Sequence, residues 1–284
     1  MNRGRDLSAT ALLGPATLFV AVSLFAPLAI LLRYSLNGFV AETKTMVEAV
    51  TLANYTKFFT DPYYTSALVT TVEVATLVTV ACLVLGFPLA YVVARTQSRF
   101  KHLLIIAIVL PLFVGNAVRA AGWMVVFGNK GFVNAGLIGL GLITRPFEIM
   151  FTEKAVIIGI IAVNLPFMVL SLQSVIEGID RAVEEAAFSL GAPPATMFRR
   201  VLWPLALPGI LAGTILTFIL AMNAYATPYL LGGPLFKMMA PVIYNEFTQK
   251  ANWPFGGAIA FILMSVTLGL TLIANLVIQR RVVR

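Results

Sequence analysis

The chain has 284 residues, of which 60% are hydrophobic and only 11% are charged, whereas a typical soluble domain has about 25% charged residues. The formal net charge is +8, but the basic residues are scattered between apolar runs and form no cluster, which argues against a nucleic-acid-binding protein. The sequence has no long polar block from which a soluble domain could be built. We therefore predict a single membrane domain over residues 1–284.

Six apolar runs reach, or nearly reach, the roughly 20 residues that a helix needs to cross the hydrocarbon core of a membrane. In chain order they are Ala11–Leu32, Val74–Ala94, Leu103 to about Phe127, Ala155–Ile176, Leu205 to about Pro228 and Phe255–Ile278. The third run is the weakest because Arg119 lies within it. Backbone polar groups in lipid must be paired within their own segment, so we expect an all-α fold with six transmembrane helices.

The distribution of Lys and Arg predicts the orientation of these helices. Basic residues are about twice as dense in both terminal tails, in the segment around Arg95 and in residues 178–204 as in the other connecting segments. Positive charge favours the cytoplasmic side, and an even number of spans places both termini on the same side. We expect a membrane protein with both termini and residues 178–204 in the cytoplasm.

The first part of that cytoplasmic segment has the pattern of a short amphipathic helix. Four apolar side chains recur at the spacing of one helix face: Val183, Ala186, Ala187 and Leu190. Asp180 can cap the first free backbone amides, and Gly191 can adopt the left-handed conformation that ends a helix. We predict a helix from Asp180 to Gly191, with Glu184 and Glu185 off its apolar face.

A second short helix is predicted from Pro193 to Pro204. Proline is tolerated in the first turn of a helix, so Pro193 and Pro194 can begin it, and Pro204 is expected to break it. Its apolar positions are Met197, Phe198, Val201 and Leu202, with Arg199 and Arg200 beside them. A connection between two spans needs only a few residues, so this longer segment predicts an interaction surface.

These residues resemble the EAA loop of permease subunits of type I ABC importers. The family pattern is Glu-Ala-Ala, three residues, Gly, nine residues, then Ile-x-Leu-Pro, and "EEAAFSLG" followed by "VLWP" fits most of it. Val201 and Trp203 depart from the pattern but stay apolar. Permeases of the spermidine/putrescine family are similar to four further stretches of this sequence: "ACLVLGFPLAYVVAR", "IMFTEKAVIIGII", "NLPFMVLSLQSVIEGID" and "NWPFGGAIA". Permeases for iron(III), opines and aminoalkylphosphonates share parts of these stretches.

The resemblance implies a permease core over residues 67–278 and a loop, residues 178–204, that docks onto a cytoplasmic ATPase. It implies that docking and coupling involve Glu185, Ala186, Ala187, Gly191, Met197, Phe198, Arg199 and Arg200. The implied complex has a second, similar permease subunit, two ABC ATPase subunits and a periplasmic substrate-binding protein, and imports polyamines. ATP and Mg²⁺ would be used by the partner ATPases, because this chain lacks the G-x-x-x-x-G-K-[ST] phosphate loop.

Two other classes of function are disfavoured by the residues. A membrane enzyme or metalloprotein needs a cluster of reactive or ligating side chains, whereas this chain has one histidine, His102, and one cysteine, Cys82. We therefore expect no catalytic site, metal site or bound cofactor. A self-contained secondary transporter would place ionisable residues within its spans, and only Glu73 and Arg119 come near them.

The candidate substrate path consists of Glu73, Trp123, Asn223, Tyr225 and Thr227. Glu73 could border the path of a cationic substrate, or Glu73 and Arg119 could pair with each other or extend toward the membrane surface. The polar groups of Asn223, Tyr225 and Thr227 could line a pore or join neighbouring helices. Trp123 and Tyr225 offer aromatic faces that could bind an ammonium group.

Overall fold

The computed structural model describes the backbone of residues 3–282 and the side chains of residues 14–276. The chain divides into two compact units, which we describe separately. The first contains residues 1–65 and 243–264, and the second contains residues 66–242 and 265–284. Three helices therefore have residues in both units: α3 (Pro62–Arg95), α13 (Met239–Thr248) and α14 (Trp253–Val282).

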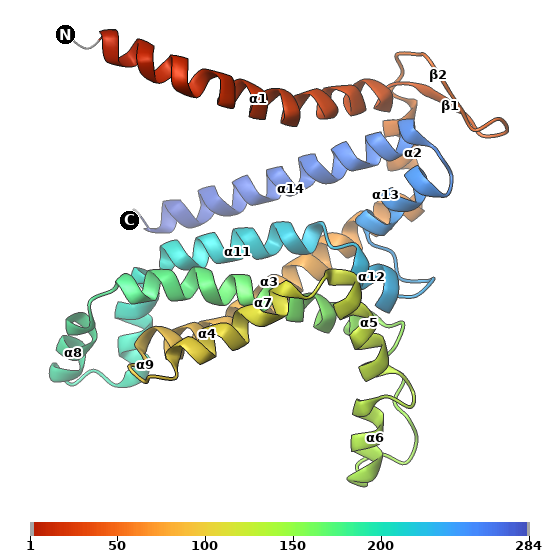
Figure 1. Cartoon of the computed structure of the whole chain (residues 1–284). Helices are drawn as coiled ribbons and strands as arrows, with labels where there is room; N and C mark the ends of the chain where they lie inside the picture. The colour runs from red at the N-terminus through yellow and green to blue at the C-terminus, as the bar shows by residue number, and fades with distance from the viewer. Residues whose placement is uncertain (1–2, 283–284) are drawn as a thin grey trace. The chain divides into compact units, whose positions relative to one another are not determined.

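The first unit begins with the long helix α1 (Arg3–Ser35), followed by an antiparallel hairpin of β1 (Gly38–Val40) and β2 (Thr45–Val47) and by α2 (Ala53–Thr60) (Figure 1). Its core includes an aromatic pair, Tyr64 and Phe255, whose ring centroids lie 4.8 Å apart. The Tyr64 hydroxyl donates to Glu246 Oε1 at 3.0 Å. These contacts hold the first turn of α3 against the ends of α13 and α14 that belong to this unit.

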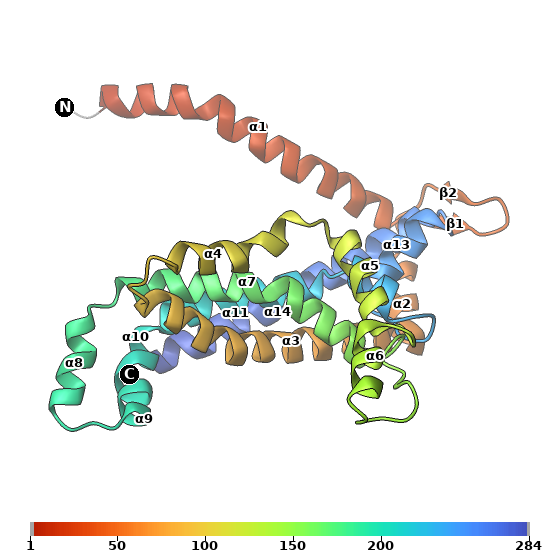
Figure 2. The same ribbon diagram turned by 60° about the horizontal axis from the view of Figure 1, so that its bottom comes forward.

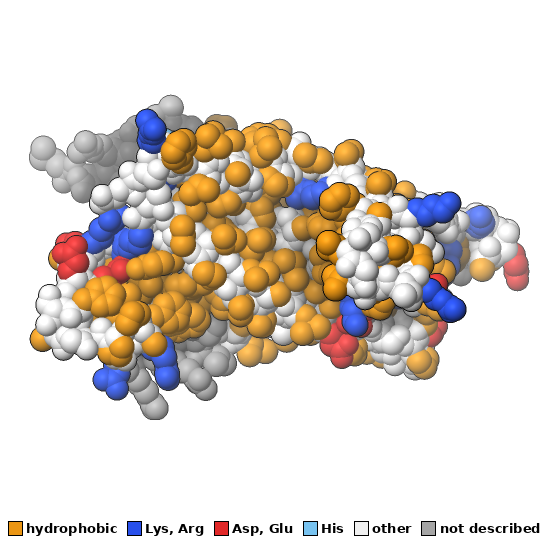
Figure 3. Space-filling model, turned by 90° about the horizontal axis from the view of Figure 1, so that it is seen from below, with side chains coloured by type: hydrophobic (Ala, Val, Ile, Leu, Met, Phe, Trp, Pro, Cys, Tyr) orange, Lys and Arg blue, Asp and Glu red, His pale blue; other side chains and the backbone are white. Residues whose placement is uncertain are grey.

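The second unit consists of helices. After α3 they are α4 (Lys101–Val109), η1 (Leu110–Phe113), α5 (Asn116–Phe127), α6 (Phe132–Gly139), α7 (Glu153–Gly178), α8 (Arg181–Ser189), α9 (Pro194–Met197), η2 (Phe198–Leu202), α10 (Trp203–Leu205), α11 (Leu207–Met222) and α12 (Ala226–Leu231). Within this unit α3, α4, α7 and α11 run alongside one another, with α8 and α9 at one end and α5, α6 and α12 at the other (Figures 1 and 2). Apolar side chains cover much of the length of these helices (Figure 3).

Four of the described helices are long and apolar enough to cross a membrane without a break: Gly14–Ser35, Pro62–Arg95, Glu153–Gly178 and Trp253–Leu276. They correspond to the first, second, fourth and sixth predicted spans. The third and fifth runs were expected to be continuous helices, and this prediction was wrong. The third is broken between Phe113 and Asn116 with a 99° bend, and the fifth is interrupted at residues 223–225, between α11 and α12. A 70° bend near Ala206 separates the preceding loop helix from α11.

Proline and glycine explain both bends. Pro111 lies in the 3₁₀ turn η1, and Gly115 then adopts a non-helical conformation before α5 begins. The 70° bend before α11 lies between Pro204 and Pro208, and neither proline can donate a backbone hydrogen bond to the preceding turn. Two such losses within five residues favour a bend over a continuous helix.

Helix α11 packs closely along α7 because two glycines, Gly209 and Gly213, face it. A methyl group on Gly209 would lie 2.9 Å from Val175 Cβ and 3.2 Å from the Ser171 carbonyl oxygen. A methyl group on Gly213 would instead meet the thioether sulfur of Met168 at 2.7 Å. This small-xxx-small spacing is typical of close helix contacts within membranes.

We predict that Gly209→Ala lowers the stability of the protein by about 1–3 kcal/mol, because the new methyl group overpacks against backbone and a β-branched side chain. Gly213→Ala should cost less, because the flexible Met168 side chain can move. The matched control is Gly122→Ala in α5, where the added methyl group meets nothing within 4 Å. Thermal unfolding of the detergent-solubilised protein measures the three changes, and equal effects at Gly209 and Gly122 would contradict this packing.

Candidate functional site

Helix α8 has defined hydrogen bonds at both of its ends. Asp180 Oδ1 accepts a hydrogen bond from the Ala182 amide at 3.0 Å, which caps the first turn. At the other end Gly191 has φ +79°, and the amides of Gly191 and Ala192 donate to the carbonyls of Phe188 and Ala187. These two bonds form a Schellman motif, which a left-handed glycine favours. The chain therefore turns sharply after α8 toward Pro193.

The apolar face of α8 points away from the rest of the unit. Leu190 is 88% exposed and Val183 is 40% exposed, whereas Glu184 is only 6% exposed. Ala186 is also exposed. An amphipathic helix that packs only on its own chain would bury these apolar side chains and expose the carboxylate. The reversed orientation leaves an apolar surface available to a partner.

Glu184 is buried because it forms an ion pair with Arg95 at the end of α3. Arg95 Nε donates to Glu184 Oε1 at 2.8 Å, and Arg95 Nη2 donates to the same oxygen. The Tyr91 hydroxyl donates to Glu184 Oε2 at 2.9 Å. Two further hydrogen bonds join the end of α3 to the segment that leads into α8. Arg95 Nη1 donates to the Ile179 carbonyl at 3.0 Å, and Arg181 Nη2 donates to the Arg95 carbonyl at 2.6 Å. These bonds connect α8 to a long apolar helix.

The sequence reasoning missed Glu184 and selected its neighbour Glu185, which is exposed. A signal for this network was present in the second apolar run. Tyr91 and Arg95 are four residues apart and therefore lie on one face of the helix, at the end of an apolar span. A partly buried cation and a partly buried phenol at that position need an acceptor, and Glu184 supplies it.

The second short helix of the loop packs inward against α3. Met197 is 5% exposed and Leu202 is 1% exposed. The Phe198 ring lies 5.1 Å from the Phe87 ring, and the Trp203 ring stacks on Phe87 at 5.6 Å. Met197 and Phe198 were expected to take part in docking, but in this structure both side chains, together with Leu202, pack against the chain's own helices. Arg199 and Arg200 are exposed, as expected for residues that flank the apolar face.

Pro204 does not end the second helix, in contrast to the prediction. The helix widens into a π-helix over Phe198–Leu202, where the Trp203 amide donates to the Phe198 carbonyl, and it continues through Pro204 to Leu205. A wider turn relieves the clash between a proline ring and the preceding turn. The helix ends at Ala206, two residues later than predicted.

A cavity of about 640 Å³ lies between α5, α7, α11 and α12 in the second unit. Three predicted path residues line it, Asn223, Tyr225 and Thr227, together with Arg119 and Asn164. The other residues that line it are Leu112, Asn116, Ala117, Ile160, Val163, Phe167, Leu220, Ala224 and Ala226. The cavity therefore combines amide, hydroxyl and guanidinium groups within a largely apolar part of the chain.

The structure does not bring the other two path candidates to this cavity. Glu73 is exposed on α3, and Trp123 stacks on Phe127 with ring centroids 4.8 Å apart. The suggested pair of Glu73 with Arg119 is also absent from the ion pairs of the described residues. Arg119 Nη2 instead donates to the Val114 carbonyl at 2.9 Å and to Asn116 Oδ1 at 3.2 Å.

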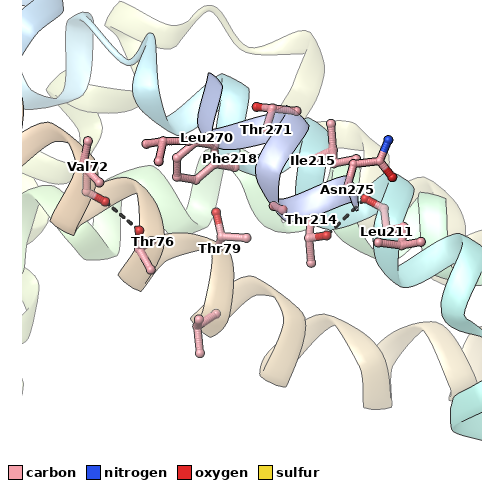
Figure 4. Close-up of a pocket in the computed structure, with 12 residues that line it drawn as sticks. Val72, Thr76, Thr79, Leu211, Thr214, Ile215, Phe218, Leu270, Thr271 and Asn275 are labelled. Carbon is pink, nitrogen blue, oxygen red and sulfur yellow. Dashed lines mark hydrogen bonds between the residues drawn. The ribbon is translucent and has the colours of Figure 1, made fainter. Parts of the chain in front are cut away.

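A smaller cavity of about 320 Å³ lies between α3, α11 and the part of α14 that belongs to the second unit (Figure 4). Its threonine hydroxyls mostly bond to their own helices: Thr76 Oγ1 donates to the Val72 carbonyl and Thr214 Oγ1 to the Ile210 carbonyl, each at 2.7 Å. This cavity therefore presents fewer free polar groups than the one at Arg119. Over the described part of the chain, no three His, Cys, Asp or Glu residues lie close enough to hold a metal ion.

Comparison with known proteins identifies the family. Residues 10–284 match the family model described as binding-protein-dependent transport system inner membrane component. The chain belongs to this family. It is a multi-pass inner-membrane protein and the permease subunit of a binding-protein-dependent ABC importer. The family is one of transport permeases and not of enzymes.

Two curated relatives are spermidine/putrescine transport system permease proteins named PotB. The protein of Haemophilus influenzae is 36% identical over 236 residues, which cover 82% of each chain. The protein of Escherichia coli strain K12 is 38% identical over 223 residues, which cover 78% of this permease and 80% of that protein.

Solved structures show the same fold at low sequence identity. A chain of the bacterial alginate ABC transporter, solved with an alginate-bound periplasmic protein, matches with a TM-score of 0.80 and 19% identity, covering 98% of this permease and 96% of that chain. The MetNI methionine ABC transporter in an inward-facing conformation matches with a TM-score of 0.61 and 18% identity, covering 79% of this permease and all of that chain.

Proposed function

We propose that this permease imports polyamines such as spermidine and putrescine. The observation that carries the proposal is the identity of 36–38%, over about four fifths of the chain, to permease proteins of spermidine/putrescine transport systems. The cavity at Asn223, Tyr225 and Thr227 is consistent with this cargo, because amide and hydroxyl oxygens can accept hydrogen bonds from ammonium groups. The face of Tyr225 can add a cation–π contact.

The permease works in a complex with four kinds of partner: a second, similar permease subunit, two cytoplasmic ABC ATPase subunits, a periplasmic substrate-binding protein and the surrounding lipid. ATP and Mg²⁺ are used by the ATPase subunits, and this chain binds neither. Six spans, of which the third and the fifth are interrupted, place both termini and residues 178–204 on the cytoplasmic side. The permease core extends over residues 67–278.

The loop of residues 178–204 couples the permease to an ATPase subunit. Its docking surface is the exposed apolar face of α8, formed by Val183, Ala186 and Leu190, with Arg199 and Arg200 available to pair with acidic groups. Glu185, Ala187 and Gly191 complete the EAA pattern around this face. Movement of the ATPase passes to α3 through the ion pair of Glu184 and Arg95, because a buried, multiply bonded pair resists separation.

The substrate proposal is tested by measuring ATP hydrolysis by the reconstituted complex in the presence of its binding protein and one ligand at a time. We expect spermidine or putrescine to stimulate hydrolysis, and an iron(III) chelate, an opine and an aminoalkylphosphonate to leave it at the basal rate. Stimulation by one of these three ligands alone would contradict the proposal that the substrate is a polyamine. It would not contradict the proposal that the protein is a permease of an ABC importer. Uptake without any ATPase subunit would instead indicate a self-contained secondary transporter.

A further inference from the structure

Arg119 has an incomplete set of hydrogen bonds at the wall of the large cavity. A guanidinium has five N–H donors and stays protonated in proteins. Arg119 Nη2 donates hydrogen bonds to the Val114 carbonyl and to Asn116 Oδ1. The Nε and Nη1 atoms of Arg119 are buried and have no hydrogen-bond partner in the described structure. Leaving such donors unpaired in an apolar region is costly, so a missing acceptor is expected.

The cavity wall built by this chain offers no counter-charge. The residues that line the cavity include no aspartate or glutamate, and the polar ones besides Arg119 are neutral amides and hydroxyls. Asn116 Oδ1 already accepts from Arg119, and Asn164 Nδ2 donates to the Thr217 carbonyl at 3.4 Å. The single formal charge on the described wall is therefore positive. An unpaired cation in such surroundings is stabilised best by a carboxylate with bidentate geometry.

We infer that Arg119 binds a carboxylate contributed by the second permease subunit across the cavity. The inference rests on the proposed function, in which two permeases face each other. The proposed polyamine cargo is cationic and cannot supply an anion. Arg119 lines the cavity and its side chain is only partly buried, so a group that enters the cavity can reach the guanidinium. This ion pair positions the two permeases, and the cargo ammonium groups compete with Arg119 for the same carboxylate.

The test uses the complete complex with Arg119→Gln, Arg119→Lys and Arg119→Glu. We expect Arg119→Gln and Arg119→Glu to lower ATP-dependent uptake of labelled spermidine by about tenfold or more, because one partner of a desolvated pair is lost or reversed. Arg119→Lys keeps the charge and should retain more uptake than Arg119→Gln. The matched control is Arg145→Gln, an exposed arginine of the same unit that does not line the cavity. Co-purification of the second permease is measured for every variant.

The acceptor is identified by charge exchange. Each acidic residue within the membrane segments of the second permease is replaced by arginine in the Arg119→Glu background, and uptake is measured again. Recovery to within about threefold of the wild-type rate at one position supports the pair, because exchange restores the attraction that the single changes remove. Normal uptake by Arg119→Gln, or recovery at no position, would overturn the inference and indicate that water or this chain satisfies Arg119. A wild-type chain that co-purifies with no second permease would contradict the proposed function as well.

Discussion

Glu184→Gln is expected to uncouple ATP hydrolysis from uptake and to destabilise the protein. Removing the charge of one partner leaves the other buried and unpaired, which typically costs about 3–5 kcal/mol. Here the cost includes the hydrogen bonds of Arg95 and Tyr91 that hold α8 on α3. The loop would then move without carrying α3 with it. We expect spermidine uptake by the reconstituted complex to fall to the background level while ATPase subunits are still bound.

The control is Glu177→Gln, which changes a carboxylate in the last turn of α7. Glu177 pairs with Lys101 at 2.7 Å, and both side chains of this pair are partly exposed to solvent. Ion pairs of this kind contribute about 1 kcal/mol or less, so this change should leave uptake near the wild-type level. Equal losses of uptake and thermal stability for Glu177→Gln and Glu184→Gln would contradict a coupling role of the Glu184–Arg95 pair.

Leu190→Glu is expected to abolish binding of the ATPase subunits while leaving the permease folded. Leu190 is 88% exposed, so the substitution removes no internal packing. It places a charge within the apolar docking surface, where association would have to remove that charge from water without a partner. Loss of both ATPase binding and uptake should follow, with an unchanged unfolding temperature of the isolated permease.

Two comparisons make this result specific. Leu235→Glu changes a leucine that is 95% exposed and lies outside the loop, and it should leave ATPase binding intact. Leu202→Ala, at a residue that is 1% exposed, should instead lower stability by about 2–5 kcal/mol because it opens a cavity between η2 and α3. Normal ATPase binding by Leu190→Glu would show that the apolar face of α8 is not the docking surface.

Apolar length and local signals predicted much of this fold. The four unbroken spans follow from run length alone, and Asp180 and Gly191 identify the ends of α8 from their ordinary roles as caps. The bend in the third run and the bend before α11 were predictable in kind, because Pro111 lies close to the first and Pro208 close to the second. Their angles depend on which neighbouring helix receives the chain after the break, which no local signal specifies.

The orientation of helix faces could not be predicted from the sequence. Periodicity groups Val183 with Leu190 but does not tell whether that face meets the same chain or a partner. For the membrane spans the orientation of the helix faces is even harder to predict. Lipid is as apolar as a protein core, so hydrophobicity does not distinguish a face that packs on protein from one that faces lipid. The cavity at Arg119 and the burial of Glu184 both depend on residues far apart in the sequence, such as Arg95, which only the folded chain brings together.

The exposure of residue 190 in the assembled importer tests the coupling role of the loop most directly. A Leu190→Cys variant, made with Cys82→Ser to remove the native thiol, is treated with a membrane-impermeant maleimide as the isolated permease and as the complex with ATPase subunits. We predict rapid labelling of the isolated permease and protection in the complex, while Leu235→Cys in the same background is labelled alike in both. Labelling of residue 190 at the same rate in both samples would contradict docking through α8.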